Sequence, residues 1–326
     1  MLQKHPRAEL VGVSDTDSHA RAVAAGAAPA AIAFADYREL LASLRPDAVV
    51  IATPTDHHRD AALASLESGA NIYLEKPIAA TIDDARAVHT AWLTSGRVGR
   101  IGFNCRFNPL YTKMKELIGA GSIGDPVAVR TSWTAGWPVD ATWRLSPGSG
   151  GGAVLELASH HVDLLRYIFD TEVQAVSTMS WSNRGDDEAA MIQLRLRSGL
   201  HSQTLVSYGT REEDRFEVLG TKGKLSIDRY DSLVVDRQPL HASGGLLTAM
   251  RRLGSEAGAI RYGREKRRSA GHEPSFHSSI SDFIDASIAG SQTSPDLLDG
   301  LRAFEVADAA RTSAREGRTV ELSIDD

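Results

Sequence analysis

The sequence predicts a two-domain α/β protein, in which a parallel sheet with crossover helices is followed by a large, mainly antiparallel open sheet. Three observations lead to this prediction. At 326 residues the chain exceeds the size at which one hydrophobic core usually stops growing. Short β-rich runs alternate with helical patterns over about the first 100 residues, and longer alternating strands follow from about residue 124. We therefore expect domains of residues 1–105 and 106–326.

The N-terminal part repeats a strand and helix unit, and most elements carry a local signal. Strands are expected at residues 10–13, 48–52, 71–74 and 98–103, of which the apolar run 48–52 is typical of a buried strand. Helices are expected at residues 17–25, 37–44, about 55–68 and 81–95. Asp17 and Asp36 are expected to cap helix starts, and Gly69 and Gly96 to end helices.

The C-terminal part of the sequence shows a different pattern of strands and helices. Long alternating strands are expected at residues 127–133 and 172–181, with helices at 152–169, 276–288 and 297–315. Residues 241–272 are rich in Gly, Ser and Arg and predict either an ordered insertion or a mobile loop. The basic run at residues 264–268 favours a solvated loop.

Composition excludes several classes of protein. A formal net charge of −6 argues against general nucleic-acid binding. No apolar run approaches the ~20 residues that cross a bilayer, and the N-terminus has no apolar core of a secretory signal, so a cytoplasmic location is expected. Cys105 is the only cysteine, which excludes an internal disulfide and a cysteine-based metal site.

Asp15 follows the first predicted strand, where a nucleotide-binding sheet places the acidic residue that accepts both ribose hydroxyls. An acid there repels a 2′-phosphate, so this interpretation favours NAD, with NADP as the alternative. A turn or helix-cap role for Asp15 fits the sequence equally well.

A dinucleotide-binding sheet also places a G-x-G-x-x-G loop about 20 residues before that acid. Only fourteen residues precede Asp15, and none of them forms such a loop. If Asp15 has this role, the Gly-rich turn falls upstream of Met1 and the parallel sheet lacks its first, central strand. A start chosen too late and a real loss both explain this, and either predicts weak NAD binding by the chain as it stands.

Glu75-Lys76-Pro77 ends a predicted buried strand, at the edge of the sheet that faces the ligand crevice. A lysine there can hydrogen-bond a substrate hydroxyl and share in moving its proton. The alternative is a surface lysine paired with the neighbouring Glu75. We favour the functional interpretation, because Pro77 restricts the backbone of Lys76 and so fixes where its side chain points.

The segment 150–163 is the most informative in the chain. On a helix, the spacing of Glu156, His160 and Asp163 produces one polar stripe. A carboxylate one turn before a histidine can orient the imidazole and raise its proton affinity, which gives a general acid or base near neutral pH. The alternatives are an exposed Glu-His pair and a zinc site, which needs at least three protein ligands; we predict no metal.

Taken together, these pieces resemble the glucose-fructose oxidoreductase and inositol dehydrogenase family, known as Gfo/Idh/MocA. The likeness lies in Ala52-Thr53-Pro54 with His58 following, Glu75-Lys76-Pro77, residues 102–109, Trp143-Arg144, the segment 150–163, and Gly220-Thr221-Lys222-Gly223. They occur in the family's order and at its spacing from about residue 8 to the C-terminus. The Glu-Lys-Pro motif alone is a modest signal, but its combination with the Gly-Gly-Gly helix block is specific.

The resemblance implies a Rossmann-like N-terminal domain, a substrate-binding C-terminal sheet that builds homo-oligomers (a dimer or tetramer), and a nicotinamide-dependent reaction on a sugar, polyol or related compound. By position, Lys76 and His160 match the family's catalytic residues, and Glu156 stands where an Asp is usual. The expected cofactor contacts are Asp15, Thr53, Pro54, His58, Glu75 and Lys76; the expected substrate contacts are Asn104, Arg106, Trp143 and Asp163.

Our working hypothesis is that the substrate carbinol gives its hydroxyl proton to the Lys76 and His160 pair and its hydride to NAD. The pair is expected to meet at a cleft between the domains. The rival hypothesis is a non-catalytic sugar-binding or scaffolding relative that has lost dinucleotide binding. The absent Gly-rich loop favours the rival, whereas the presence of Lys76, Glu156 and His160 opposes it, because a pure binder has less need of them.

Overall fold

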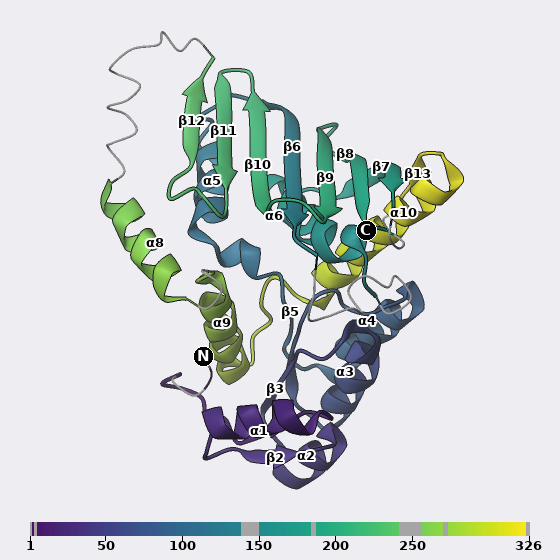
Figure 1. Cartoon of the computed structure of the whole chain (residues 1–326), viewed down its shortest axis with the longest axis vertical. Helices are drawn as coiled ribbons and strands as arrows, with labels where there is room; N and C mark the ends of the chain where they lie inside the picture. The colour runs from purple at the N-terminus through teal and green to yellow at the C-terminus, as the bar shows by residue number, and fades with distance from the viewer. Residues whose placement is uncertain are drawn as a thin grey trace. The chain divides into compact units, whose positions relative to one another are not determined.

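The computed structural model describes Leu2 and residues 5–137, 150–183, 187–240, 256–269 and 273–323 (Figure 1). The chain divides into two compact units, each with two segments. Unit 1 comprises Met1–Phe103 and Phe276–Leu301, and unit 2 comprises Asn104–Ser275 and Arg302–Asp326. The first change of unit lies close to the predicted boundary at 105/106. The sequence did not predict the return of residues 276–301 to unit 1.

The strands of unit 1 are all parallel, as predicted, and fall into two sheets. β1 (Gly12–Ser14) pairs with β2 (Ile32–Phe34), while β4 (Asn71–Leu74) lies between β3 (Ala48–Ile51) and β5 (Gly99–Ile101). Because neighbouring strands run in one direction, their carboxyl ends share one edge of each sheet. The sequence analysis missed β2, a three-residue strand of which two residues are exposed.

Helices alternate with these strands, and short-range caps fix where they begin. They are α1 (Ser18–Ala27), α2 (Tyr37–Leu44), α3 (His58–Glu67), α4 (Ile82–Ser95) and α9 (Ser275–Ala289). Asp17 accepts from the backbone N–H of Ala20 at 2.8 Å, and Asp36 from that of Arg38 at 2.8 Å. Both predicted N-caps are thereby confirmed.

The core of unit 1 forms around β4. Ile72, Tyr73 and Leu74 are buried, and the ring of Tyr73 meets that of Phe283 on α9 edge-on at 5.8 Å. The prediction of a buried strand at 48–52 is only half right: β3 is present, but Val50 is exposed. β3 is the last strand of its sheet, with β4 as its only neighbour there, so its side chains are less covered.

Unit 2 is built on one eight-stranded sheet, with strand order β12-β11-β10-β6-β9-β8-β7-β13. Neighbours are antiparallel except β6 and β9, which confirms the mainly antiparallel sheet. The strands are β6 (Pro126–Ala135), β7 (Val173–Trp181), β8 (Ala189–Leu196), β9 (His201–Tyr208), β10 (Glu213–Gly220), β11 (Gly223–Asp228), β12 (Asp236–Pro239) and β13 (Val320–Glu321).

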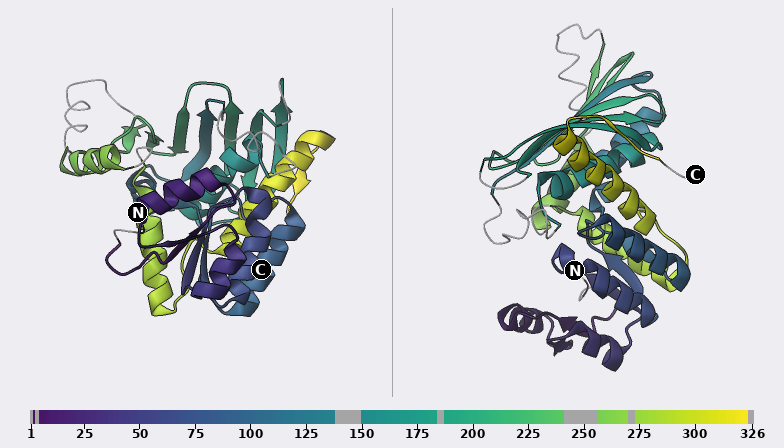
Figure 2. Two further views of the ribbon diagram at one scale, coloured as in Figure 1. Left: turned by 60° about the horizontal axis from the view of Figure 1, so that its bottom comes forward. Right: turned by 90° about the vertical axis from the view of Figure 1, so that its right-hand side faces the viewer.

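Helices α5, α6 and α10 lie on one face of this sheet (Figure 2). Their bounds, with those of the π-helical segment η6 that precedes α6, are α5 (Pro109–Gly119), η6 (Val154–Ala158), α6 (Ser159–Phe169) and α10 (Leu297–Glu316). On the covered face, Thr131 of β6 donates a hydrogen bond to Thr204 of β9 at 2.9 Å. This face of the sheet therefore supports the helix that carries Glu156 and His160.

The basic run at residues 264–268 forms the end of a helix, α8 (Glu256–Arg268), so the predicted solvated loop is wrong. Its Lys266 amine donates to the carbonyl oxygens of Arg229 at 2.7 Å and Tyr230 at 2.5 Å. Glu, Ala, Lys and Arg are good helix formers, and they outweigh the two glycines in this helix. None of the helices in the described part of the chain combines the length and apolar character needed to cross a membrane.

Candidate functional site

Asp15 lies at the carboxyl end of β1 and is exposed. Its backbone N–H donates to the carbonyl oxygen of Phe34 at 3.3 Å, and its side-chain Oδ1 accepts from the backbone N–H of Asp17 at 2.8 Å. The carboxylate therefore shapes the turn into α1, as one of the two interpretations predicts. Because the side chain is also exposed, the geometry allows it to accept hydrogen bonds from a ligand as well.

The turn after β3 consists of exposed residues and is supported by a buried histidine. Thr53 and Pro54 are exposed, whereas His58 is buried. The ring of His58 reaches the carbonyl oxygens of Pro77, at 2.8 Å from Nδ1, and of Thr53, at 2.9 Å from Nε2. His58 thus ties the turn after β3 to the turn after β4. The structure therefore shows a supporting role for His58, and the direct cofactor contact that the resemblance implied stays a prediction.

Lys76 is half-buried and follows the carboxyl end of β4, as predicted. Its backbone N–H donates to Glu75 Oε2 at 3.3 Å, and the Lys76-Pro77 peptide bond is cis. The Glu75 carboxylate packs against Gly102, just after β5, where an added Cβ would lie 2.6 Å from Oε2. The Glu75 side chain therefore contacts both the backbone of this turn and the residue that follows β5.

The helix that carries Glu156 and His160 begins with a π turn, so the regular helix predicted over 152–169 is wrong across residues 154–158. Hydrogen bonds in a π turn span one residue more than in an α-helix, and such turns are frequent at functional sites. Glu156 lies in the π turn and His160 in the first turn of α6, and both are buried. Spacing alone could not reveal the π turn, because it depends on contacts distant in sequence.

Trp133 of β6 is a site residue that the sequence analysis missed. Its ring lies 4.7 Å from that of His160, centroid to centroid, at an interplanar angle of 31°. The guanidinium carbon of Arg229 lies 5.0 Å from the same tryptophan ring. The alternation of β6 was the available signal, since it places Trp133 on the same face as the buried Thr131. The tryptophan contact restricts the plane of the His160 imidazole.

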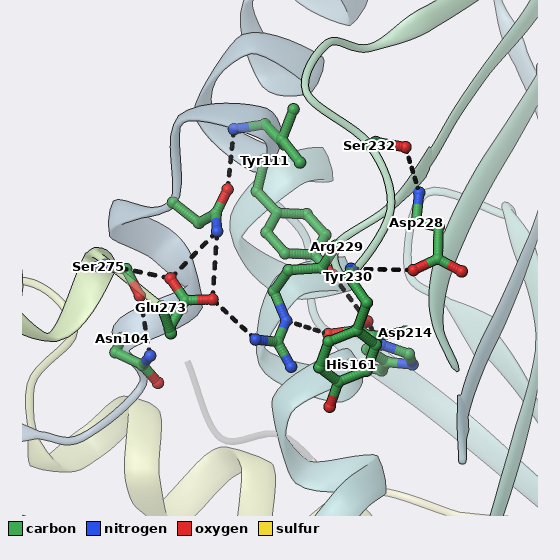
Figure 3. A network of polar contacts seen from close by, with 12 residues as sticks. Asn104, Tyr111, His161, Asp214, Asp228, Arg229, Tyr230, Ser232, Glu273 and Ser275 are labelled. Atoms are coloured by element: carbon green, nitrogen blue, oxygen red, sulfur yellow. Dashed lines mark hydrogen bonds and ion pairs between the residues drawn. The ribbon is translucent and has the colours of Figure 1, made fainter. Parts of the chain in front are cut away.

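Asp214 of β10 is the centre of a buried polar network, the Asp214 network (Figure 3). Its Oδ1 accepts from the hydroxyl of Tyr111 at 2.9 Å and lies 2.9 Å from His161 Nε2, and its Oδ2 accepts from Arg229 Nε. Burial alone would raise the pKa of Asp214, but Arg229 and His161 outweigh it and hold the pKa well below its usual value. Asp214 is therefore an ionised carboxylate at neutral pH.

The network extends from Arg229 to the end of α8 and the start of α9. The guanidinium of Arg229 also donates to Glu273 at 2.7 Å, and Asn108 donates to the same carboxylate at 3.2 Å. The Asn108 amide lies 3.1 Å from the hydroxyl of Tyr262, whose pKa burial raises to about 12. These contacts link β11, α5 and α8 without a water-exposed charge.

The predicted substrate contacts are engaged within unit 2. Arg106 and Asp163 form a buried bidentate ion pair, with Nε to Oδ2 at 2.9 Å and Nη2 to Oδ1 at 2.5 Å. The Asn104 amide donates to the hydroxyl of Ser275 at 2.8 Å. Asp163 thus joins α6 to the segment before α5. Trp143 lies outside the described residues.

Residues 119–124 read G-x-G-x-x-G, but their context differs from that of a dinucleotide-binding loop. They follow the end of α5 and precede β6, whereas the fingerprint follows a parallel strand and opens a helix. An added Cβ on Gly124 would lie 2.2 Å from the hydroxyl oxygen of Thr221. This stretch therefore packs against the β10-β11 turn.

Two family models match the chain. The model described as the oxidoreductase family with an NAD-binding Rossmann fold matches residues 1–103. The model described as the GFO/IDH/MocA C-terminal domain matches residues 111–226. The two matches fall on unit 1 and unit 2 in the order that the sequence analysis implied.

Individual relatives agree with these matches. The chain is 31% identical over 194 residues to the 1,5-anhydro-D-fructose reductase of Ensifer adhaerens, an alignment that spans 57% of this chain and only 58% of that relative. It is 26% identical over 328 residues to inositol 2-dehydrogenase 1 of Saccharopolyspora erythraea, which covers 98% of this chain and 90% of the relative.

A solved structure with the same fold is the WlbA dehydrogenase from Bordetella pertussis in complex with NADH and UDP-GlcNAcA. The TM-score is 0.82 at 24% sequence identity, and the match covers 99% of this chain and 92% of that one. This likeness confirms the α/β fold.

Asp214→Asn should destabilise the protein by about 3 to 5 kcal/mol at neutral pH, because it removes one of the two buried carboxylates, Asp214 and Glu273, that pair with the buried Arg229. The folded-state pKa of Asp214 lies below the unfolded value of about 3.9, so the stability from the charged form is complete above about pH 5 and declines as pH falls through the folded pKa. The difference in the free energy of unfolding between wild type and variant, measured by urea denaturation, should therefore shrink below about pH 4. The control is Asp125→Asn, because Asp125 is exposed. A difference in unfolding free energy between wild type and Asp214→Asn that stays constant with pH would contradict this account.

Proposed function

The chain belongs to the GFO/IDH/MocA oxidoreductase family, whose N-terminal domain is an NAD-binding Rossmann fold, and on that premise we propose a hydride transfer between NAD and a hydroxyl or keto carbon of a sugar or polyol. One observation carries the proposal. A lysine stands at the carboxyl end of a parallel strand in unit 1, and a buried histidine, preceded by Glu156 in a π turn, stacks on a tryptophan in unit 2.

The described residues of unit 1 fit NAD in part. The exposed Asp15 carboxylate suits the ribose hydroxyls, and Thr53, Pro54 and Lys76 follow strand ends at the edge where nucleotides bind. Within the described part of unit 1, no Gly-rich turn follows a parallel strand. When bound, NAD supplies the hydride acceptor or donor.

We propose that Lys76 and His160 hold and move the proton of the substrate hydroxyl. An amine that is only half-buried keeps access to a ligand, and the stacked imidazole has a fixed ring plane. Glu156 lies in the π turn that leads into α6, four positions before His160. A pair of groups that share one proton suits oxidation and the reverse reduction equally, so the proposal leaves the direction of reaction open.

Sugars and polyols are the proposed substrates because the relatives are named for such compounds, namely an anhydrofructose reductase and an inositol dehydrogenase. Lys76, Glu156 and His160 support catalysis over the rival hypothesis of a sugar-binding relative. The partial fit to NAD is the observation that favours the rival. Measured turnover decides between the two.

We also propose that the chain forms a homodimer or tetramer through the sheet face opposite α6 and α10. Met179, Met191 and Leu205 lie directly opposite one another on β7, β8 and β9, and their exposed fractions are 78%, 52% and 36%. Trp181, two positions beyond Met179 on the same face of β7, is also exposed, and we call these four side chains the apolar row. A contiguous exposed apolar row on a flat sheet indicates a protein interface, and a second copy of the same face matches it by symmetry.

Lys76→Ala and His160→Asn should each lower kcat at least 100-fold, because each removes half of the proton-transfer pair. Turnover of myo-inositol, scyllo-inositol and glucose at high NAD⁺ concentration is the measurement. The double variant should be no slower than the single variants if the two residues act as one unit. The exposed Lys113→Ala is the control, and undiminished turnover by Lys76→Ala would defeat the assignment.

NAD⁺ should bind the chain in a calorimetric titration, because the exposed Asp15 carboxylate suits the ribose hydroxyls. Asp15→Asn should also narrow the preference for NAD⁺ over NADP⁺, since it removes the charge that repels a 2′-phosphate. An unchanged preference for NAD⁺ over NADP⁺ in Asp15→Asn would contradict the role proposed for Asp15.

Met191→Glu should convert the oligomer to monomers in sedimentation velocity experiments, because it places a charge at the centre of the apolar row. Leu93→Glu on α4 is the matched control, since Leu93 is also exposed (61%) but lies in unit 1. A wild-type chain that is monomeric at micromolar concentration would disprove the proposed interface.

A further inference from the structure

The start of the π turn is capped by a residue from a distant part of the chain. The helix start at Ala153 has no capping side chain of its own. Asp187, just before β8, accepts from the backbone N–H of Ala153 through its carbonyl oxygen at 2.7 Å and from that of Val154 through Oδ1 at 3.3 Å. Two helix-start donors are thereby satisfied, and a negative charge lies where the helix dipole favours it.

The approach between Asp187 and the glycine turn before the helix is close. Gly152 has φ +98°, and an added Cβ would lie 2.3 Å from Asp187 Oδ2 and 3.0 Å from Asp187 Cβ. Only glycine adopts this conformation and leaves this space. Asp187 itself has φ +59°, which is uncommon for a residue with a side chain and is found most often where surrounding contacts enforce it.

Arg311 of α10 completes the arrangement. Its Nη2 donates to the carbonyl oxygen of Gly151 at 3.1 Å, and its Nε lies 3.5 Å from Asp187 Oδ2. The side chains of Arg311 and Asp187 are 20% and 10% exposed. One guanidinium therefore holds both the glycine turn and the carboxylate that caps the helix; we call this pair the Asp187-Arg311 clamp.

We propose that Asp187 and Arg311 are positioning residues for Glu156 and His160, an inference that rests on the proposed function. The backbone N–H of Glu156 donates to the carbonyl oxygen of Gly152 at 2.9 Å, so a shift of the glycine turn passes directly into the π turn. His160 follows in the same continuous helix. Misplacement of a reacting group by about 1 Å can lower a rate by about 100-fold, which makes this anchor relevant to turnover.

Asp187→Asn and Arg311→Ala should each lower kcat for myo-inositol with NAD⁺ by about 10- to 100-fold, with KM changed by less than about twofold. This split is expected because the clamp contacts the helix start and not the substrate. Arg311→Lys should recover part of the rate, since an amine keeps the charge but loses one of the two directed N–H groups. Arg302→Ala is the matched control: Arg302 is another partly buried arginine of α10, paired with Glu305 at 3.1 Å.

A second measurement is independent of turnover. The ring-proton NMR shifts of His160 depend on its stacking against Trp133, so they should move in Asp187→Asn and Arg311→Ala and stay unchanged in Arg302→Ala. Unchanged His160 shifts in the clamp variants would overturn the inference, as would moved shifts with wild-type kcat. A wild-type chain without turnover would sink the proposed function alone, and the NMR shifts would still decide whether the clamp positions His160.

Discussion

The candidate site of unit 2 depends on the hydrogen bonds and ion pair of the buried Asp214 carboxylate. It lies on the covered face of β10 and joins Tyr111 of α5, His161 of α6 and Arg229 after β11. A buried charge must keep its partners, because the loss of one leaves an uncompensated charge in a medium that solvates it poorly. The three elements are therefore held to one position on the sheet, and His160 is held with them because it is the neighbour of His161.

Adjacent residues of a helix point about 100° apart, and α6 uses this difference. His161 reaches Asp214 of β10, while His160 stacks on Trp133, the residue of β6 directly opposite Asp214; the Trp133 ring also lies 5.5 Å from the ring of His161. Two residues beyond His161, Asp163 pairs with Arg106 and fixes the same helix a second time. The helix is thus anchored on either side of the direction in which His160 points, and the imidazole need not contribute to that anchoring.

Much of the fold could be predicted because its signals are local. An N-cap such as Asp36 needs a partner only two residues away, and strand alternation is visible within one strand. The candidate site is less local. Arg106 and Asp163 are 57 positions apart, and the π turn that carries Glu156 is capped by Asp187 from beyond β7. Sequence spacing predicted a set of candidate polar residues but not which of them pair with each other.

The residues that the family resemblance assigns to ligand contacts differ in how deeply they are buried. Thr53, Asp15 and half-buried Lys76 keep surface through which a ligand can be bound, whereas Arg106 and Asp163 are buried against each other. An arginine in a buried bidentate pair cannot turn to a substrate without leaving the carboxylate unpaired, which costs several kcal/mol. A substrate contact would have to repay that cost in full. The ion pair therefore supports α6, and the substrate contacts implied for Arg106 and Asp163 stay a prediction.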